Sequence, residues 1–224
     1  MSDKDYCYPP EFNVLKNKLN IRNADDLEKI ERIYVLQRTR QGVPKGNFDL
    51  SHLQAIHKHL FQDVYEWAGE IRTVRLTKEN QEFQYPKYIA AGMQDVHGRI
   101  KKAGYLQGLN KSDFAHKAGE IIGDVNFVHP FREGNGRTQL QYLKQLGERA
   151  GHKLDLGKLE KDKWLEASRQ AHGGKDYDLM ASSIESAIID REKTSDSRSE
   201  ELKKRYEGQR ASKSQRENEK DRER

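Results

Sequence analysis

Apolar side chains recur every three or four positions along most of residues 1–190, the spacing that places them on one face of an α-helix. Leu50, Leu53, Ile56 and Leu60 form one such stripe, and Asn23 precedes another as a capping residue. The pattern predicts helices over residues 24–37, 50–61, 88–103, 113–127, 137–150, 158–171 and 176–191. The predicted fold is therefore all-α.

The spacing changes between Gly69 and Pro86. Ile71, Val74 and Phe83 belong to two stretches whose residues favour extended structure, and the polar residues 77–82 lie between them. A polar turn between two short apolar stretches predicts a β-hairpin over about residues 71–85.

Charge separates a C-terminal tail from the body of the chain. The whole chain is 34% hydrophobic and 34% charged, whereas soluble domains are roughly 45–50% apolar. Residues 191–224 contain 12 Lys or Arg and 9 Asp or Glu, and their apolar side chains are Leu202, Tyr206 and Ala211. Since this composition cannot form a core, we expect a domain over residues 1–190 and a tail over 191–224 that is disordered or a single solvated helix.

Composition also bears on partners and compartment. The formal net charge is +5, but both signs are interleaved, which gives little support to nucleic-acid binding. No apolar run reaches the roughly 18–20 residues of a membrane span, and the first residues have no apolar region typical of a signal peptide. We therefore expect no nucleic-acid or membrane partner and a cytoplasmic location, with export as an effector left open.

The segment HPFREGNGR, which begins at His129, lies between two predicted helices and concentrates the candidate chemistry. Gly134 and Gly136 allow close backbone approach, and the amides that open the following helix form a site for an anion such as a phosphate. Glu133 is a carboxylate suited to Mg²⁺, and Arg137 can bind phosphate oxygens through two N–H groups. His129 can take a proton from a hydroxyl group near neutral pH. This combination predicts a functional site rather than an ordinary turn.

The segment resembles the signature of the Fic family (filamentation induced by cAMP), His-x-Phe-x-Asp/Glu-Gly-Asn-Gly-Arg-x-x-Arg, at every fixed position except the last. Similar stretches occur at residues 8–9, 15–19, 48–50, 60–61 and 63–69, so the likeness extends over about residues 5–190. The resemblance implies a Fic-type helical bundle with a β-hairpin flap. It also implies a protein adenylyltransferase, which moves AMP from ATP, with Mg²⁺, to a Ser, Thr or Tyr hydroxyl of a target protein.

Roles for individual residues follow from the same resemblance. His129 would be the general base and Glu133 the Mg²⁺ ligand, and the nucleotide phosphates would bind at Gly134, Asn135, Gly136 and Arg137. The 71–85 hairpin resembles the Fic flap, which pairs edge to edge with an extended target segment. We therefore expect a target to dock at Arg72, Thr73, Val74 and Phe83. Lys78 and Glu79, at the predicted turn, would lie near the nucleotide.

Leu140 replaces the last arginine of the signature. In the family that arginine holds the γ-phosphate and pairs with an inhibitory glutamate, and an apolar side chain does neither. Three consequences compete: slow transfer, compensation by Lys144 one turn along the helix, or loss of transfer with nucleotide or protein binding retained. Since a minority of the family transfers other nucleotide moieties or phosphocholine, or phosphorylates, a Fic enzyme with another donor is a further alternative.

The inhibitory helix of the family carries Ser/Thr-x-x-x-Glu-Gly/Asn. Each Glu followed by Gly or Asn in this chain, at positions 79, 133, 207 and 217, has Arg, His or Lys four residues earlier. The chain therefore resembles Fic toxins whose inhibitor is a separate small helical antitoxin, or Fic proteins that lack such an inhibitor.

Overall fold

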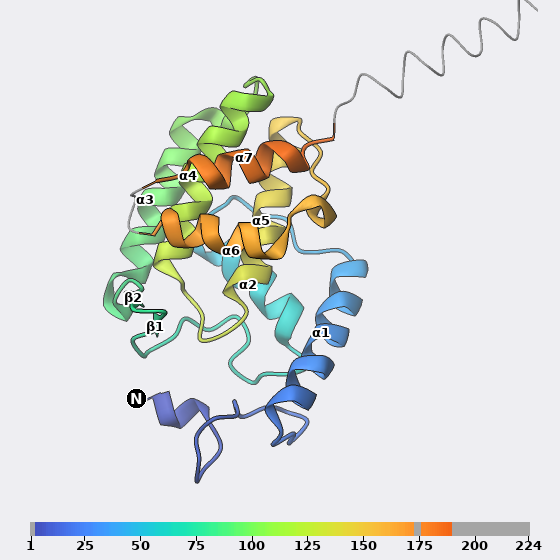
Figure 1. Cartoon of the computed structure of the whole chain (residues 1–224), viewed down its shortest axis with the longest axis vertical. Coiled ribbons are helices and arrows are strands. Elements are labelled where there is room, and N and C mark those ends of the chain that lie inside the picture. Colours follow the sequence, from blue (N-terminus) through green and yellow to red (C-terminus); the bar gives the residue numbers. More distant parts are fainter. Residues whose placement is uncertain (1–2, 173–175, 190–224) are drawn as a thin grey trace, which may run out of the picture. The chain divides into compact units, whose positions relative to one another are not determined.

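The computed structural model describes residues 3–172 and 176–189, and this part of the chain is mainly helical (Figure 1). Its α-helices are α1 Ala24–Arg40, α2 Leu50–Phe61, α3 Ile89–Lys102, α4 Lys111–Val128, α5 Asn135–Ala150, α6 Lys161–Gln170 and α7 Asp178–Ala187. Short 3₁₀ helices occur at Asp3–Tyr6, Pro86–Tyr88, Gly104–Leu106 and Leu156–Lys158. The prediction of an all-α fold is confirmed.

Side-chain caps explain where the first helices begin. Asn23 Oδ1 accepts a hydrogen bond from the Asp26 amide at 3.0 Å, and Asp49 Oδ1 accepts one from the His52 amide at 2.8 Å. Each of these bonds satisfies an amide that has no partner within its own helix. The cap of α4 is Asn110, so this helix begins two residues before its predicted start at residue 113.

The last helix is shorter than predicted. The sequence pattern places it over 176–191, but α7 ends at Ala187 because Ile188 turns to extended backbone and pairs with Leu154. The Asp155 amide then donates to the Ala187 carbonyl at 2.9 Å. The predicted tail, 191–224, lies outside the described residues, so its boundary with the body stays a prediction.

Helix α4 forms the centre of the core and packs against α3, α5 and α7. Its residues Phe114, Ala118, Ile122 and Val125 are fully buried. Gly119 allows α7 to approach closely, because a Cβ atom there would lie 3.1 Å from the Ala181 amide nitrogen. In Figure 1, α6 and α7 lie in front of this central helix, and α2 packs between α1 and α5.

The predicted hairpin is present but short. Strands β1 Thr77–Lys78 and β2 Gln81–Glu82 pair antiparallel, with Thr77 opposite Glu82 and Lys78 opposite Gln81. The two turn residues, Glu79 and Asn80, have φ values of 50° and 64°, the left-handed conformation that a two-residue turn between twisted strands requires. Residues 71–76, which belong to the predicted hairpin, form no strand.

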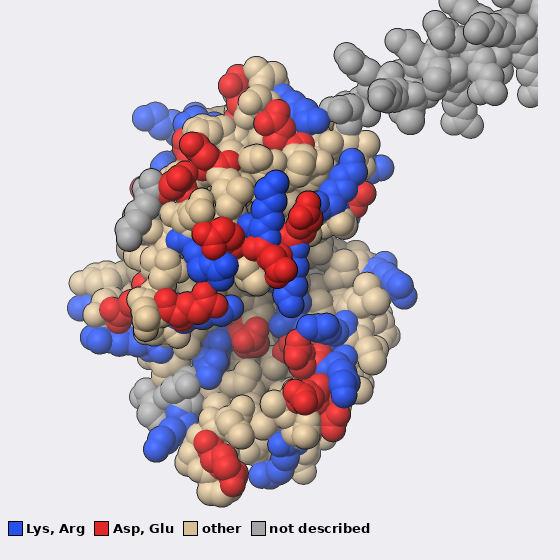
Figure 2. Space-filling model, in the orientation of Figure 1, with Lys and Arg blue, Asp and Glu red and all other residues tan. Residues whose placement is uncertain are grey.

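The surface carries both signs of charge. On the face drawn in Figure 2, Lys and Arg side chains are interleaved with Asp and Glu side chains and do not gather into one basic area. Among the described helices, none has the length and apolar character that crossing a membrane requires.

Candidate active site

The segment between α4 and α5 has a fixed backbone. His129 ends α4 in the left-handed conformation, with φ 47° and ψ 63°, and Gly134 caps α5 with φ +80°. A Cβ atom at Gly134 would lie 2.3 Å from the Phe61 ring, so this position excludes every larger residue. Asn135 closes the loop, because its side chain accepts from the Phe131 amide at 2.9 Å and donates to the Phe131 carbonyl at 2.7 Å.

Phe131 and His57 hold this loop on the core. The Phe131 ring is fully buried and stacks on the His57 ring, with a centroid distance of 3.9 Å. His57 Nε2 and the Glu133 carbonyl oxygen are 2.9 Å apart, and the Gly69 amide donates to His57 Nδ1 at 2.8 Å. These two contacts make Nε2 the protonated nitrogen of a neutral ring, and burial lowers the pKa of His57 to about 4.

His129 presents one ring nitrogen as a proton acceptor. Its Nδ1 lies 3.1 Å from the Asn126 carbonyl oxygen, and a carbonyl only accepts, so Nδ1 carries the hydrogen and Nε2 has the lone pair. The ring also stacks on Phe83 at a centroid distance of 3.7 Å. Burial is the main cause that lowers the pKa of His129 to about 3, and the charges of Arg72 and Lys78 lower it further. The imidazole is therefore neutral at neutral pH, as a general base requires.

Arg137 is held by two carboxylates. Its Nη2 lies 2.5 Å from Glu31 Oε1 and 3.4 Å from Glu133 Oε1, and the guanidinium lies over the Phe61 ring. The other oxygen of Glu31 accepts a hydrogen bond from the Tyr65 hydroxyl at 2.5 Å. Burial and the neighbouring Glu31 raise the pKa of Tyr65, so the phenol stays protonated and donates.

Glu31 was not found by sequence analysis. Its side chain is almost fully buried on the face of α1 that also carries Leu27 and Val35, at the helical spacing of one stripe. A carboxylate inside an apolar stripe needs a partner, and this signal was visible in the sequence. The sequence did not show which residue is the partner, since Arg137 is more than 100 residues away along the chain.

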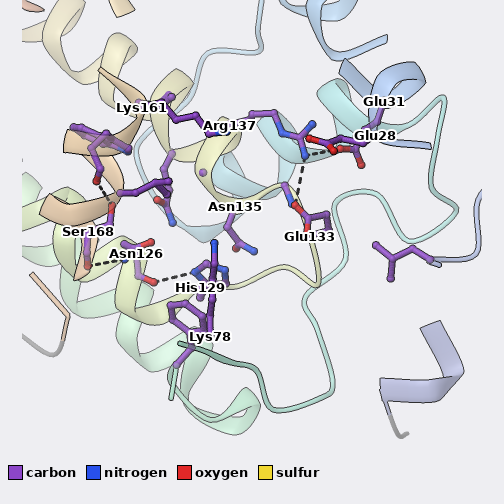
Figure 3. Close-up of a pocket in the computed structure, with 18 of the residues that line it drawn as sticks. Glu28, Glu31, Lys78, Asn126, His129, Glu133, Asn135, Arg137, Lys161 and Ser168 are labelled. Atoms are coloured by element: carbon purple, nitrogen blue, oxygen red, sulfur yellow. Dashed lines mark hydrogen bonds and ion pairs between the residues drawn. The ribbon is translucent and has the colours of Figure 1, made fainter. Parts of the chain in front are cut away.

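One cavity of about 730 Å³ brings most of the predicted site together (Figure 3). Its lining includes the predicted residues Lys78, Glu79, His129, Glu133, Gly134, Asn135, Gly136 and Arg137. It also includes residues that sequence analysis did not select, among them Glu28, Glu31, Tyr65, Asn126, Lys161, Trp164, Ser168 and Arg169. The lining therefore comes from α1, the hairpin, the α4–α5 segment and α6.

The cavity fits a polyanion better than it fits a metal held by protein alone. The described residues contain no group of three His, Cys, Asp or Glu side chains that could bind a metal. Glu133 is a single, half-exposed carboxylate whose Oε1 accepts from the Gly134 amide at 2.8 Å. One carboxylate is sufficient for a Mg²⁺ ion whose other ligands are water and substrate phosphates.

The hairpin tip is attached to α6. Glu79 Oε2 pairs with Arg169 Nη1 at 3.0 Å, and the Gln81 side chain donates to the Arg169 carbonyl at 3.0 Å. His172 Nε2 lies 3.1 Å from the Glu82 carbonyl oxygen. These contacts place Lys78 and Glu79 on the wall of the cavity, and their contact with a nucleotide stays a prediction.

Three of the four flap residues predicted to dock a target have buried side chains. Arg72, Val74 and Phe83 are 1%, 6% and 8% exposed, and only Thr73 of the four predicted residues is exposed. The Phe83 ring is used against His129. These three side chains pack under the flap, and the predicted docking through the backbone edge of the flap stays a prediction.

Arg72 connects the flap to the end of α4. Its guanidinium donates to the carbonyl oxygens of Val74, Gln84 and His129 at 2.6, 2.5 and 2.7 Å, and to that of Val128 at 3.3 Å. These four acceptors are main-chain carbonyls, and burial lowers the pKa of Arg72 to about 10, so it remains charged at neutral pH. The negative end of the α4 dipole lies at this point and favours a cation there.

Fold and site together define a helical domain in which the N-terminus of α5 and a neutral histidine line one cavity. Residues 47–146 match the Fic/DOC family. A probable protein adenylyltransferase of Sinorhizobium fredii, y4lH, is 39% identical over 169 residues, which cover 75% of this chain and 88% of that protein. The chain therefore belongs to the Fic/DOC family.

Two further proteins show how the similarity is distributed. The protein adenylyltransferase VbhT of Bartonella schoenbuchensis is 36% identical over 179 residues, 78% of this chain but 37% of that longer protein. The crystal structure of the BepC effector protein of Bartonella tribocorum with bound AMPPNP has a TM-score of 0.76 and 26% identity, and the match covers 84% of this chain and 98% of that one. The predicted Fic-type fold is confirmed.

Proposed function

We propose that this chain is a protein adenylyltransferase that moves AMP from ATP to a Ser, Thr or Tyr hydroxyl of another protein. One observation carries the proposal: a neutral His129 with a free Nε2 lines the same cavity as the N-terminus of α5 and Arg137. Such a cavity supplies a base for a hydroxyl and a binding site for phosphate. Two curated relatives are named as adenylyltransferases, and a structural relative binds an ATP analogue.

The proposed reaction assigns one step to each group. The target hydroxyl oxygen attacks the α-phosphorus of ATP while its proton passes to His129 Nε2. The bond from the α-phosphorus to the oxygen that bridges to the β-phosphate breaks, and pyrophosphate leaves. Main-chain N–H groups at Asn135 and Gly136 stabilise the phosphate charge, with Arg137 beside them, while the Gly134 amide donates to Glu133 Oε1. Glu133 would hold Mg²⁺, which supplies charge neutralisation when bound.

Asn135 contributes to this site through its main chain. Its side-chain amide is bonded to both polar groups of the Phe131 backbone, so the side chain fixes the loop.

For the flap, Thr73 and the unpaired edge of β1 are the exposed positions, and we propose that an extended target segment pairs with this edge.

Leu140 supports a second candidate, a Fic fold that binds nucleotide and has little transferase activity. The side chain lines the cavity and packs partly on the core, so no charge stands at this position. Loss of one charge-assisted contact costs about 1.5–3 kcal/mol, which weakens a site without abolishing it. The active transferase therefore remains our first proposal. The identity of the donor nucleotide is tested in the same experiment.

A labelling experiment distinguishes the two candidates. The wild type, His129→Ala and Leu140→Arg are each incubated with tagged ATP, Mg²⁺ and a cell lysate, and nucleotide binding is measured by calorimetry. Labelling of a protein that depends on His129 supports the transferase. Binding of ATP without any labelling by the wild type or Leu140→Arg supports the binding module. If neither protein labels or binds nucleotide, both proposals are wrong, unless GTP, UTP or CDP-choline replaces ATP in the same assay.

We also propose that the chain is the toxin of a pair with a small helical antitoxin. Because Leu140 has no charge and Arg137 is already paired with Glu31, a glutamate from such a partner would gain little at this site. The partner should therefore still bind when that glutamate is replaced by glycine, as measured by calorimetry. Loss of binding on that replacement would contradict this account of position 140.

A further inference from the structure

The cavity contains two cations without a carboxylate partner. Arg32 pairs with Glu28, Arg137 pairs with Glu31 and Glu133, and Arg169 pairs with Glu79 and Glu166. The remaining basic residues of the lining are Lys78 and Lys161, and neither forms an ion pair within residues 3–172 and 176–189. An unpaired cation on the wall of an anion-binding cavity is available to a ligand.

The two lysines belong to different ends of the cavity. Lys78 is close enough to His129 for its charge to lower the pKa of that histidine. In Figure 3, Lys78 lies beyond His129, and Lys161 lies on the side of Arg137. Because the proposed reaction takes place at His129, Lys78 is at the reacting end, and Lys161 is at the end that holds the rest of the ligand.

At the end of the cavity near Lys161, helix α5 supplies no positive charge from position 140, because this residue is a leucine. After Asn135, the residues of this helix that line the cavity are Gly136, Arg137, Gln139 and Leu140. Arg137 is shared between two carboxylates, and Leu140 is apolar. A triphosphate that extends from the helix N-terminus along this wall carries several negative charges, so it needs a cation from another element.

Lys161 is the cation that the fold places there. It is the first residue of α6, it is exposed, and its flexible four-carbon chain carries three N–H donors. Lys144, the substitute suggested by helical spacing, is not among the described residues that line the cavity.

We propose that Lys161 binds the terminal phosphate of the nucleotide and supplies the charge that position 140 lacks. The proposal rests on the proposed function, since it requires a nucleotide in this cavity. It makes a specific claim about the ligand, because a contact to the terminal phosphate acts on ATP and does not act on AMP.

The test measures Kd for ATP and AMP by calorimetry, each with Mg²⁺, for the full chain. Lys161→Ala should weaken ATP binding by about 10- to 100-fold and leave AMP binding unchanged. The matched controls are Lys163→Ala, an exposed lysine on the same helix, and Lys144→Ala on α5, and neither should change either Kd. Leu140→Arg in the Lys161→Ala background should restore ATP binding.

The alternatives give different results. If Lys161→Ala leaves ATP binding unchanged, or weakens ATP and AMP equally, the proposed role of Lys161 is wrong while the proposed function stands. If the wild type binds neither nucleotide, the proposed function fails, and the role of Lys161 fails with it. A circular dichroism spectrum and a thermal melt of each variant check that the fold is retained.

Discussion

The Glu31 carboxylate is 4% exposed, and each of its oxygens has a different donor. Tyr65 occupies one oxygen and Arg137 the other, so the arginine of the proposed phosphate site is positioned from α1. Removing one partner of a buried charged pair leaves the other without compensation, and this cost exceeds the loss of an exposed pair.

Glu31→Gln should lower the free energy of unfolding by about 1–3 kcal/mol, less than for a fully buried pair, because the Arg137 side chain is 32% exposed. Urea denaturation measures the change. Glu28→Gln is the matched control, since Glu28 pairs with Arg32 on the same helix but both side chains are exposed, and it should cost less than about 0.5 kcal/mol. Equal effects of the two variants would contradict the structural role of Glu31.

Acid should destabilise the fold through its buried histidines. The pKa of His57 is lowered from 6.5 to about 4 and that of His129 from 6.5 to about 3, so the unfolded chain binds protons that the folded chain excludes. Their contribution to stability is complete above pH 6.5 and is lost as the pH falls from there toward 4, with a loss of up to about 3 kcal/mol from His57.

Unfolding free energies between pH 7.5 and 4.5 test this dependence. In His57→Phe, the fall in stability over this interval should be smaller, whatever the absolute stability of the variant. His116→Gln, which removes an exposed histidine, should keep the wild-type slope. A His57→Phe slope identical to that of the wild type would show that His57 does not cause the dependence.

At the scale of elements, local chemistry was predictable and long-range packing was not. The residues of the α4–α5 segment are adjacent in sequence, so one short motif indicated the phosphate site. The helices followed from apolar spacing, but the end of α7 depends on Leu154, which is more than 30 residues away. The burial of Arg72 could not be predicted, because the carbonyls of Val128 and His129 that accept from it lie more than 50 residues along the chain.

Arg72→Met should detach the flap from the end of α4. The substitution keeps much of the side-chain length but removes every N–H donor, so the carbonyls of Val74, Gln84 and His129 lose a partner. We expect a loss of about 3–5 kcal/mol and faster amide hydrogen exchange in residues 73–84 than in α4. Arg75→Met is the control, because Arg75 is exposed and its contacts are with Tyr85 and Glu82 at the surface. Unchanged exchange in the flap of Arg72→Met would refute this connecting role.

At the scale of the whole molecule, the site is assembled from distant parts of the chain. Residues from α1 to α6 line one cavity, so the body must fold before any nucleotide can bind. The comparison with the BepC structure supports the body as one folding unit, since the match covers 98% of that chain. Residues 191–224 contain only three apolar side chains, and the described residues that line the cavity lie between positions 13 and 169.

A chain that stops at residue 190 should therefore retain the site. We expect its Kd for ATP and its His129-dependent labelling to equal those of the full chain, measured side by side at about 0.15 M salt, where the Debye length is about 8 Å and long-range charge effects of the tail are screened. A weaker Kd for the shortened chain at this salt concentration would mean that residues 191–224 take part in nucleotide binding. If the two proteins bind ATP equally but label different targets, the tail acts in target selection, and the body alone carries the chemistry.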